Sequence, residues 1–182
     1  ADLTLSDTYT LPFDGISVKF SHSGAYLAVG STDSPYFILL NHIDGELSFS
    51  DDYKLPARCR GISFSPDDKY IATVHNTSPY LTLLLNTDGN LSKASQFILP
   101  STGYSVDFSP DGNYVVAGSY GTHNVTLLSH SDGVLAKVSG YTAMGGNSVN
   151  AVTFSPDGKY IAVGGGNSPY FELLENVEGT LV

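Results

Sequence analysis

Tryptophan is absent from this sequence of 182 residues, and cysteine and basic residues are scarce. Cys59 is the only cysteine, so an intrachain disulfide is impossible. Eight lysines and arginines stand against 18 acidic residues, and the net charge of -10 disfavours binding to nucleic acids and to anionic membranes. No apolar run approaches the roughly 20 residues of a transmembrane helix, and no window has the periodicity of an amphipathic helix.

What is present is one pattern that occurs four times. It begins at Phe20, Phe64, Phe108 and Phe154, so the spacings are 44, 44 and 46 residues. Its fullest form, residues 154–164, reads Phe-Ser-Pro-Asp-Gly-Lys-Tyr-Ile-Ala-Val-Gly. A fixed period of this size indicates an array of supersecondary units, none of which buries its apolar faces alone.

Each repeat divides into four short strands, which we name a to d. Strand a ends in the phenylalanine, and Ser-Pro-Asp-Gly forms a tight turn into strand b. A Ser-Pro-Tyr break leads to strand c in three repeats, and the third repeat has Thr122-His123-Asn124 instead. An Asp-Gly hairpin, which is Glu178-Gly179 in the fourth repeat, leads to strand d. We therefore expect an all-β chain of about sixteen strands in one domain, 1–182. The repeats run approximately over residues 12–55, 56–99, 100–143 and 144–182, the last completed by residues 1–11.

The run Val-x-Phe-Ser-Pro-Asp-Gly-Lys-Tyr-Ile-Ala-Val-Gly that contains Phe154 resembles the a–b hairpin of WD40-like repeats, of the WD40 and YVTN/lactonase types. The resemblance covers all four repeats. This sequence lacks the Trp-Asp pair at the end of strand c, so the hydrogen-bonded network of true WD40 repeats is not expected in this chain. The resemblance implies a β-propeller with four four-stranded blades of about 44 residues per chain, in which the d–a and b–c loops share one face.

The two ends of the chain predict how the propeller closes. Aligning Tyr9 with Tyr53 and Leu11 with Leu55 makes residues 2–11 a strand d without strands a to c before it. The fourth repeat stops where its own strand d should begin. We therefore expect closure by strand exchange, with an eight-bladed ring formed as a homodimer favoured. The alternatives are a four-bladed monomer closed within one chain and a piece of a longer propeller.

The loops of the d–a and b–c face differ between repeats, so they hold the candidate binding residues. In an acidic chain, two arginines near the expected axis can hold an anionic group through bidentate hydrogen bonds. The candidates for binding a ligand or partner are Arg58, Arg60, Tyr104, Tyr120, His75, His123 and Met144. One equivalent position of strand a supplies the candidates for lining the channel, which are Lys19, Ser63, Asp107 and Thr153.

No catalytic motif is present: there is no Gly-x-Ser-x-Gly, no His-Glu-x-x-His and no phosphate-binding glycine loop. Cys59 lies between two arginines, which favours a thiolate if it is exposed, and the other interpretation is a small buried core residue. The histidines have no metal-ligand spacing. We therefore expect no cofactor, no metal and no enzyme activity.

The function that we expect is a non-catalytic scaffold that mediates protein binding or homo-oligomeric assembly, without nucleic acid or membrane. One alternative is a structural subunit of a larger assembly, for instance a viral or phage particle. Another is a lactonase-type hydrolase, which rests only on the resemblance of the repeats. The sequence does not indicate a compartment.

Overall fold

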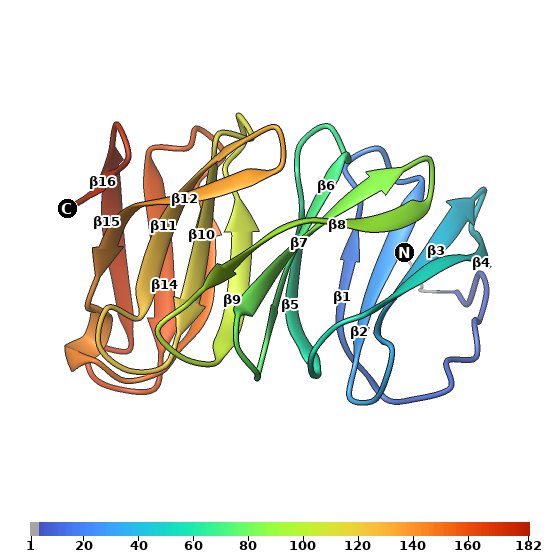
Figure 1. The fold of residues 1–182 in the computed structure, drawn as a ribbon, viewed down its shortest axis with the longest axis horizontal. Helices are drawn as coiled ribbons and strands as arrows, with labels where there is room; N and C mark the ends of the chain where they lie inside the picture. The colour runs from blue at the N-terminus through green and yellow to red at the C-terminus, as the bar shows by residue number, and fades with distance from the viewer. Residues whose placement is uncertain (1–3) are drawn as a thin grey trace.

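The computed structural model describes residues 4–182, in which sixteen strands form four antiparallel sheets of four strands each. We call the sheets blades 1 to 4. They stand side by side along the long axis in sequence order, with blade 1 and blade 4 at opposite ends of the row (Figure 1). The all-β fold and its division into four-stranded blades are confirmed.

Blade 1 holds β1 (Gly15–Phe20), β2 (Tyr26–Ser31), β3 (Tyr36–Ile43) and β4 (Glu46–Lys54). Blade 2 holds β5 (Cys59–Phe64), β6 (Tyr70–His75), β7 (Tyr80–Thr87) and β8 (Asn90–Ile98). Blade 3 holds β9 (Gly103–Phe108), β10 (Tyr114–Ser119), β11 (Val125–Ser131) and β12 (Val134–Tyr141). Blade 4 follows the short 3-10 helix η1 (Ala143–Gly145) and holds β13 (Val149–Phe154), β14 (Tyr160–Gly165), β15 (Phe171–Val177) and β16 (Thr180–Leu181).

The Ser-Pro-Asp turn between the first two strands is held by the same hydrogen bonds in three blades. In blade 4, the Ser155 hydroxyl donates to Asp157 Oδ1 over 2.6 Å and accepts from the Tyr160 N–H over 2.9 Å. The Lys159 N–H also donates to Asp157 Oδ1, over 3.1 Å. Blades 2 and 3 repeat these bonds at Ser65 with Asp67 and at Ser109 with Asp111. The recurrence of this sequence is therefore explained by turn geometry.

We expect acid to destabilise the protein through these aspartates. Hydrogen bonds from the Ser155 hydroxyl and the Lys159 N–H hold the pKa of Asp157 below its usual 3.8. Burial raises the pKa of Asp67 and of Asp111, but the hydrogen bonds that both carboxylates accept outweigh it, so both pKa values are also lowered. A pKa that is lower in the folded than in the unfolded chain adds stability that is complete above about pH 4 and is lost as the pH falls below it.

Urea unfolding at a series of pH values tests this expectation. Replacing the three turn aspartates by asparagine should make the fall in unfolding free energy below about pH 4 shallower, by the equivalent of about one to three protons. A control variant with asparagine at three exposed aspartates outside these turns, Asp14, Asp52 and Asp88, removes the same charge and should keep the wild-type slope. Equal slopes for the two variants would contradict the assignment.

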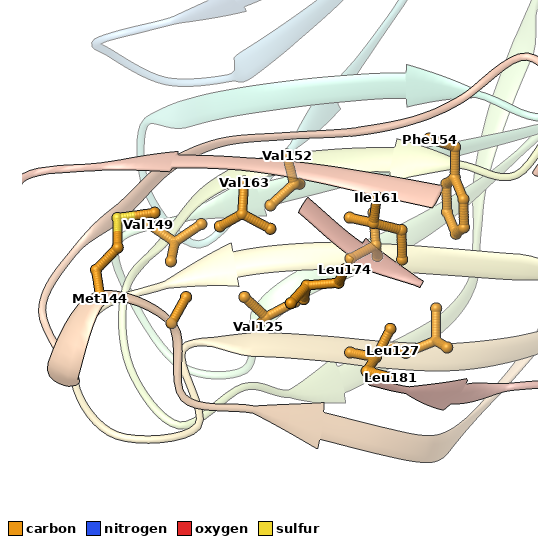
Figure 2. Close-up of a cluster of buried hydrophobic side chains, with 12 residues drawn as sticks. Val125, Leu127, Met144, Val149, Val152, Phe154, Ile161, Val163, Leu174 and Leu181 are labelled. Carbon is orange, nitrogen blue, oxygen red and sulfur yellow. The ribbon is translucent and has the colours of Figure 1, made fainter. Parts of the chain in front are cut away.

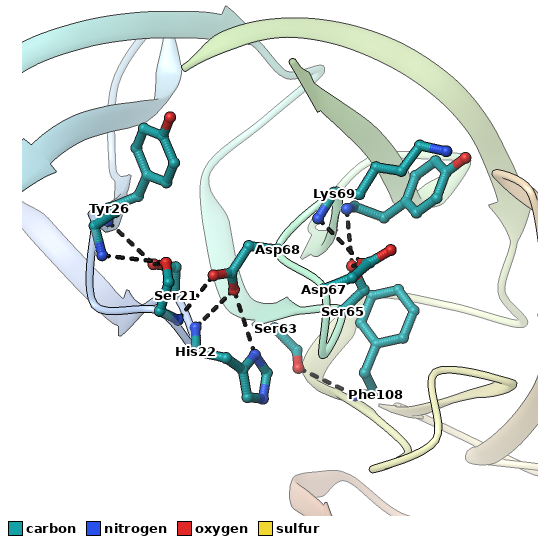
Figure 3. A network of polar contacts seen from close by, with 12 residues as sticks. Ser21, His22, Tyr26, Ser63, Ser65, Asp67, Asp68, Lys69 and Phe108 are labelled. Carbon is teal, nitrogen blue, oxygen red and sulfur yellow. Dashed lines mark hydrogen bonds and ion pairs between the residues drawn. The ribbon is translucent and has the colours of Figure 1, made fainter. Parts of the chain in front are cut away.

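Repeat two has Asp68 where the other three repeats have glycine, and this exception connects two blades. Asp68 has a φ of 60°, and its carboxylate accepts the N–H groups of His22 and Ser23 over 2.6 and 2.8 Å. The His22 ring lies 3.5 Å from the same carboxylate (Figure 3). The a–b turn of blade 2 is thereby tied to that of blade 1.

The core lies between neighbouring blades. Between blades 3 and 4, Val125 and Leu127 of β11 pack against Val152 and Phe154 of β13 and Leu174 of β15 (Figure 2). Two equivalent clusters fill the spaces between blades 1 and 2 and between blades 2 and 3. Each blade thus has an outgoing face, which meets the next blade, and an incoming face, which meets the previous one.

The segment 4–11 lies on the incoming face of blade 1 in the place of a missing strand d. The Ser6 hydroxyl donates to the Gly45 carbonyl over 3.0 Å, and the Leu47 N–H donates to Asp7 over 2.7 Å. The strand d of blade 1 makes the same two bonds to blade 2, from Ser50 to Gly89 and from Leu91 to Asp51. The equivalence of this segment to strand d therefore holds for residues 4–11, whereas residues 2 and 3 of the predicted strand lie outside the described residues.

Candidate functional site

The innermost strands of the four blades bring one equivalent position of each repeat to a common hollow. Ile16, Arg60, Tyr104 and Asn150 occupy this position, and Arg58 joins them from the d–a loop of blade 2. The hollow has a volume of about 410 Å³. The hollow lies where the d–a loops lead into the inner strands β1, β5, β9 and β13. We call it the channel mouth.

Arg60 is held in a defined orientation at the channel mouth. Its Nε–H donates to Asn76 Oδ1 over 2.5 Å, and its guanidinium carbon lies 4.9 Å from the centre of the Tyr104 ring. No ion pair to a carboxylate is formed by Arg58 or Arg60 in the described chain. Three of the predicted binding residues, Arg58, Arg60 and Tyr104, are therefore brought together. Asn76, which orients Arg60, was not predicted.

Tyr120 and His123 do not line the channel mouth, although both are exposed, as expected for residues of a b–c loop. The placement of His75 on an accessible loop is wrong, because β6 extends to His75 and buries it fully. Its two ring nitrogens lie 2.8 Å from the Thr77 carbonyl and 3.0 Å from the Thr82 hydroxyl. Burial lowers the pKa of His75, which keeps the ring neutral in this polar pair of contacts.

Met144 is also misplaced as a surface residue. It lies in η1 with a φ of 50° and is buried in the cluster between blades 3 and 4 (Figure 2). Its N–H donates to Glu172 Oε1 over 2.8 Å. Cys59 is buried as well, and burial raises the pKa of its thiol. The interpretation of Cys59 as a core residue is the one that the structure supports.

The equivalent position of strand a that was predicted to line the channel forms bridges between blades. Asp107 accepts hydrogen bonds from the Ser63 hydroxyl of blade 2 over 3.0 Å and from the Thr153 hydroxyl of blade 4 over 2.9 Å. Asp107 also accepts the Phe154 N–H over 2.9 Å, and the Ser63 hydroxyl accepts the Phe108 N–H over 3.1 Å. A polar side chain at this position therefore accepts a backbone N–H from the next blade.

This arrangement corrects one member of the predicted channel lining. Ser63 is only 2% exposed, so it bridges two blades and does not face an open channel. Asp107 is half-buried, and Lys19 and Thr153 are exposed. The last two belong to blades 1 and 4, each of which lacks one neighbouring blade within the described chain.

The inner part of the incoming face of blade 1, on β1, is exposed, whereas residues 4–11 cover the outer part. Val18 and Phe20 of β1 are 67% and 51% exposed. Their equivalents in the other three blades are at most 7% exposed: Ile62, Val106, Val152, Phe64, Phe108 and Phe154. The same side chains that fill the core elsewhere therefore lie open on blade 1.

The outgoing face of blade 4 is exposed in the same way. Phe171 and Leu173 of β15 are each 58% exposed. Their equivalents are fully buried: Phe37, Leu39, Leu81, Leu83, Val125 and Leu127. The two exposed faces are thus the two halves of one blade interface, and they lie at opposite ends of the row (Figure 1).

Residues 4–182 contain no group of three or more histidine, cysteine or carboxylate side chains placed to hold a metal ion. In the same part of the chain, no helix has the length and hydropathy required to cross a membrane.

Four antiparallel blades whose inner strands lie side by side define a β-propeller-type domain, and comparisons with solved structures agree. A protein of unknown function from Desulfotomaculum acetoxidans superposes with a TM-score of 0.80 at 18% identity, over 96% of this chain and 56% of its own. A proposed 6-phosphogluconolactonase of Bacteroides uniformis superposes with a TM-score of 0.79 at 18% identity, over 91% of this chain and 52% of its own. Hydrazine synthase of Kuenenia stuttgartiensis superposes with a TM-score of 0.77 at 11% identity, over 100% of this chain and 51% of its own. These identities show the fold alone, and the chain spans about half the length of each structure.

The family model for the WD domain, G-beta repeat, matches residues 101–125 and 137–168. These two segments are therefore similar to WD40 repeats, which confirms the resemblance noted in the sequence, and the fold of the whole chain is of the β-propeller type. A comparison with curated proteins gives no match.

Proposed function

We propose that this chain is a half-propeller whose function is homo-oligomeric assembly: two copies close into one eight-bladed, non-catalytic ring. The observation that carries the proposal is the exposure of Val18 and Phe20 at one end and of Phe171 and Leu173 at the other. The three interfaces inside the chain bury all the equivalents of these residues. A second copy supplies both complements at once, because its blade 1 meets blade 4 and its blade 4 meets blade 1.

Strand exchange fits the same arrangement. The outer edge of β15 pairs with β16 at Asn176 and Val177, and Glu175 exchanges two backbone hydrogen bonds with Val182, so residues 171–174 have no outer partner in the described chain. Residues 4–11 pair with no described strand and already lie in the place of a preceding strand d. β16 and Val182 fill the positions that align with residues 2–4, so the exchange needs residues 5–11 of the second copy. Pairing would remove an open sheet edge from both chains.

Two other closures compete with this one. A four-bladed ring closed within one chain would bring blade 4 against blade 1, and it is disfavoured by the exposure of both faces in the row (Figure 1). Further blades of a longer polypeptide would cover the same faces. Two copies of this chain approach the length of the solved structures that it matches, of which one copy covers 51–56%.

The solution mass measured by light scattering tests the proposal. We expect twice the chain mass of 19.3 kDa, without larger species, because a two-copy ring leaves no free face. A mass of one chain at all concentrations would overturn it.

A cross-link tests the strand exchange separately. In blade 1, Phe37 of β3 pairs with Tyr53 of β4, and the equivalent pair in the ring is Phe171 with Tyr9 of the second copy. Replacing Phe171 and Tyr9 by cysteine should therefore give a disulfide-linked dimer on a non-reducing gel. The native Cys59 is buried, so it should not compete.

The remaining alternatives have their own tests. The likeness to a proposed 6-phosphogluconolactonase is one of fold at 18% identity, and it supports a hydrolase only as a hypothesis. Turnover of simple lactones by the assembled protein would support that hypothesis. A role as a subunit of a larger assembly predicts that the ring binds further protein copies, which the same light-scattering measurement would detect.

A further inference from the structure

We propose that the channel mouth binds an oxyanion, the carboxylate or phosphate group of a small molecule, through Arg58 and Arg60. The hollow of about 410 Å³ is lined by these two residues together with Ile16, Tyr104 and Asn150. All five come from one chain, so the site is complete without ring closure. The volume lies within the roughly 300–1,000 Å³ that small-molecule sites occupy.

The charge of the channel mouth differs from that of the rest of the molecule. Three other hollows of 310 to 380 Å³ lie among the turns of the other face. Each is lined by two or three aspartates and a single lysine, drawn from Asp67, Asp68, Asp88, Asp111, Asp132, Asp157, Lys69 and Lys159. The channel mouth has two guanidinium groups and no carboxylate among its lining residues. In a chain with a net charge of -10, a concave positive site attracts an anion locally where the remaining surface repels it.

Arg60 is preorganised for such a ligand. The Asn76 side-chain oxygen accepts a hydrogen bond from the Arg60 Nε–H, and the Tyr104 ring packs against the flat face of the guanidinium. The two terminal nitrogens keep their donors, and their planar geometry matches two oxygens of a carboxylate or phosphate. Because the side chain is already held, less conformational entropy is lost when the anion binds.

The other lining residues suit the remainder of such a molecule. The Ile16 side chain and the Tyr104 ring offer apolar surface next to the arginines, and the Asn150 amide can both donate and accept a hydrogen bond. A small organic acid or a sugar phosphate presents this combination of an anionic group and a compact body. A two-copy ring would hold two such sites, one from each chain.

Isothermal titration calorimetry of the full chain with citrate and with inorganic phosphate, at low ionic strength, tests the site. We expect saturable binding of one anion per chain, weakened by added salt. Arg60→Ala and Arg58→Ala should each weaken binding at least about tenfold. Arg60→Lys should also weaken it, because lysine keeps the charge but offers neither the planar pair of donors nor the stacking surface. Lys93→Ala removes one exposed charge elsewhere on blade 2 and should leave binding unchanged.

Two results would overturn the proposal. One is the absence of saturable binding of either anion at up to about 50 mM. The other is binding that Arg60→Lys and the Arg58→Ala/Arg60→Ala variant leave unchanged. Because the readout is anion affinity per chain, failure here is distinct from a one-chain mass in light scattering, which bears only on ring closure.

Discussion

Replacing Leu173 by aspartate is expected to convert the proposed assembly of two chains into single chains. Leu173 is 58% exposed in one chain, whereas Leu39, Leu83 and Leu127 are fully buried between blades. In the proposed ring it is buried against blade 1 of the second copy, where an aspartate would be desolvated without a partner. The ring contains this contact twice, and burial of one leucine contributes about 1.5–3 kcal/mol, so the dissociation constant should rise at least about a hundredfold.

Ile43→Asp is the matched control. Ile43 is also exposed, at 68%, but its equivalents Thr87, Ser131 and Val177 are exposed in every other blade. An aspartate there should leave the dissociation constant unchanged. Both substitutions replace exposed side chains, so neither should alter the unfolding free energy of the single chain by more than about 0.5 kcal/mol. Leu173→Asp protein that assembles as tightly as Ile43→Asp protein would contradict the ring.

A mixing experiment separates a closed ring from other dimers. Val18→Asp places a charge on the complementary face, and alone it should also prevent assembly. A heterodimer of Val18→Asp with Leu173→Asp has both charges in one interface and an intact second interface. Mixing the two variants should therefore restore part of the assembly, whereas a chain that carries both substitutions should remain single. A dimer built from one self-complementary patch would not show this rescue.

The strands and their grouping could be predicted because the repeat period is visible in the sequence. The turn signals after Phe64, Phe108 and Phe154 are local, and the structure places a strand on each side of every one. The position of residues 4–11, equivalent to that of a strand d, followed from the alignment of Tyr9 with Tyr53, and the matching bonds of Ser6 and Ser50 confirm this position. Local chemistry and repeat phase were sufficient for these features.

The environment of individual side chains could not be predicted in the same way. His75 stands where a loop was expected, but one further residue of strand pairing turns it into the core toward Thr82. Met144 enters the core through a short 3-10 turn that breaks the repeat pattern. Asn76 orients Arg60 from a neighbouring loop, and only a three-dimensional contact reveals that role.

The repeat phase also indicates most of the lining of the channel mouth. Ile16 and Asn150 occupy the same position as Arg60 and Tyr104, and the structure places all four around the channel mouth. Reading that position across the four repeats would have found four of the five lining residues, all except Arg58. The sequence could not show that Arg60 forms no ion pair with a carboxylate, because many acidic residues of the chain are equally possible partners by sequence. Only the structure shows this.

Replacing Asp107 by alanine is expected to destabilise the chain by about 3–5 kcal/mol, since hydrogen bonds to a charged group contribute about 1.5–3 kcal/mol each. Its carboxylate accepts from the Ser63 hydroxyl, the Thr153 hydroxyl and the Phe154 N–H, and so joins blades 2 and 4 to blade 3. Alanine removes all three bonds and leaves the Phe154 N–H without an acceptor. Urea unfolding of the variant, compared with the wild type at pH 7, measures the loss.

Asp107→Asn and Asp52→Ala show whether the bonds or merely the charge are responsible. Asparagine keeps an acceptor oxygen for the Phe154 N–H and can donate to the Ser63 hydroxyl, so it should cost about half as much as alanine or less. Asp52 is an exposed aspartate of β4, and its replacement by alanine should change stability by less than about 0.5 kcal/mol. If Asp107→Ala costs no more than Asp52→Ala, the bridging role is wrong. Ser63 accepts the Phe108 N–H and Asp107 accepts the Phe154 N–H, each from the blade that follows. If the bridging role of Asp107 is correct, we expect Thr153 of blade 4 to accept the equivalent N–H from the blade that follows it in the proposed ring.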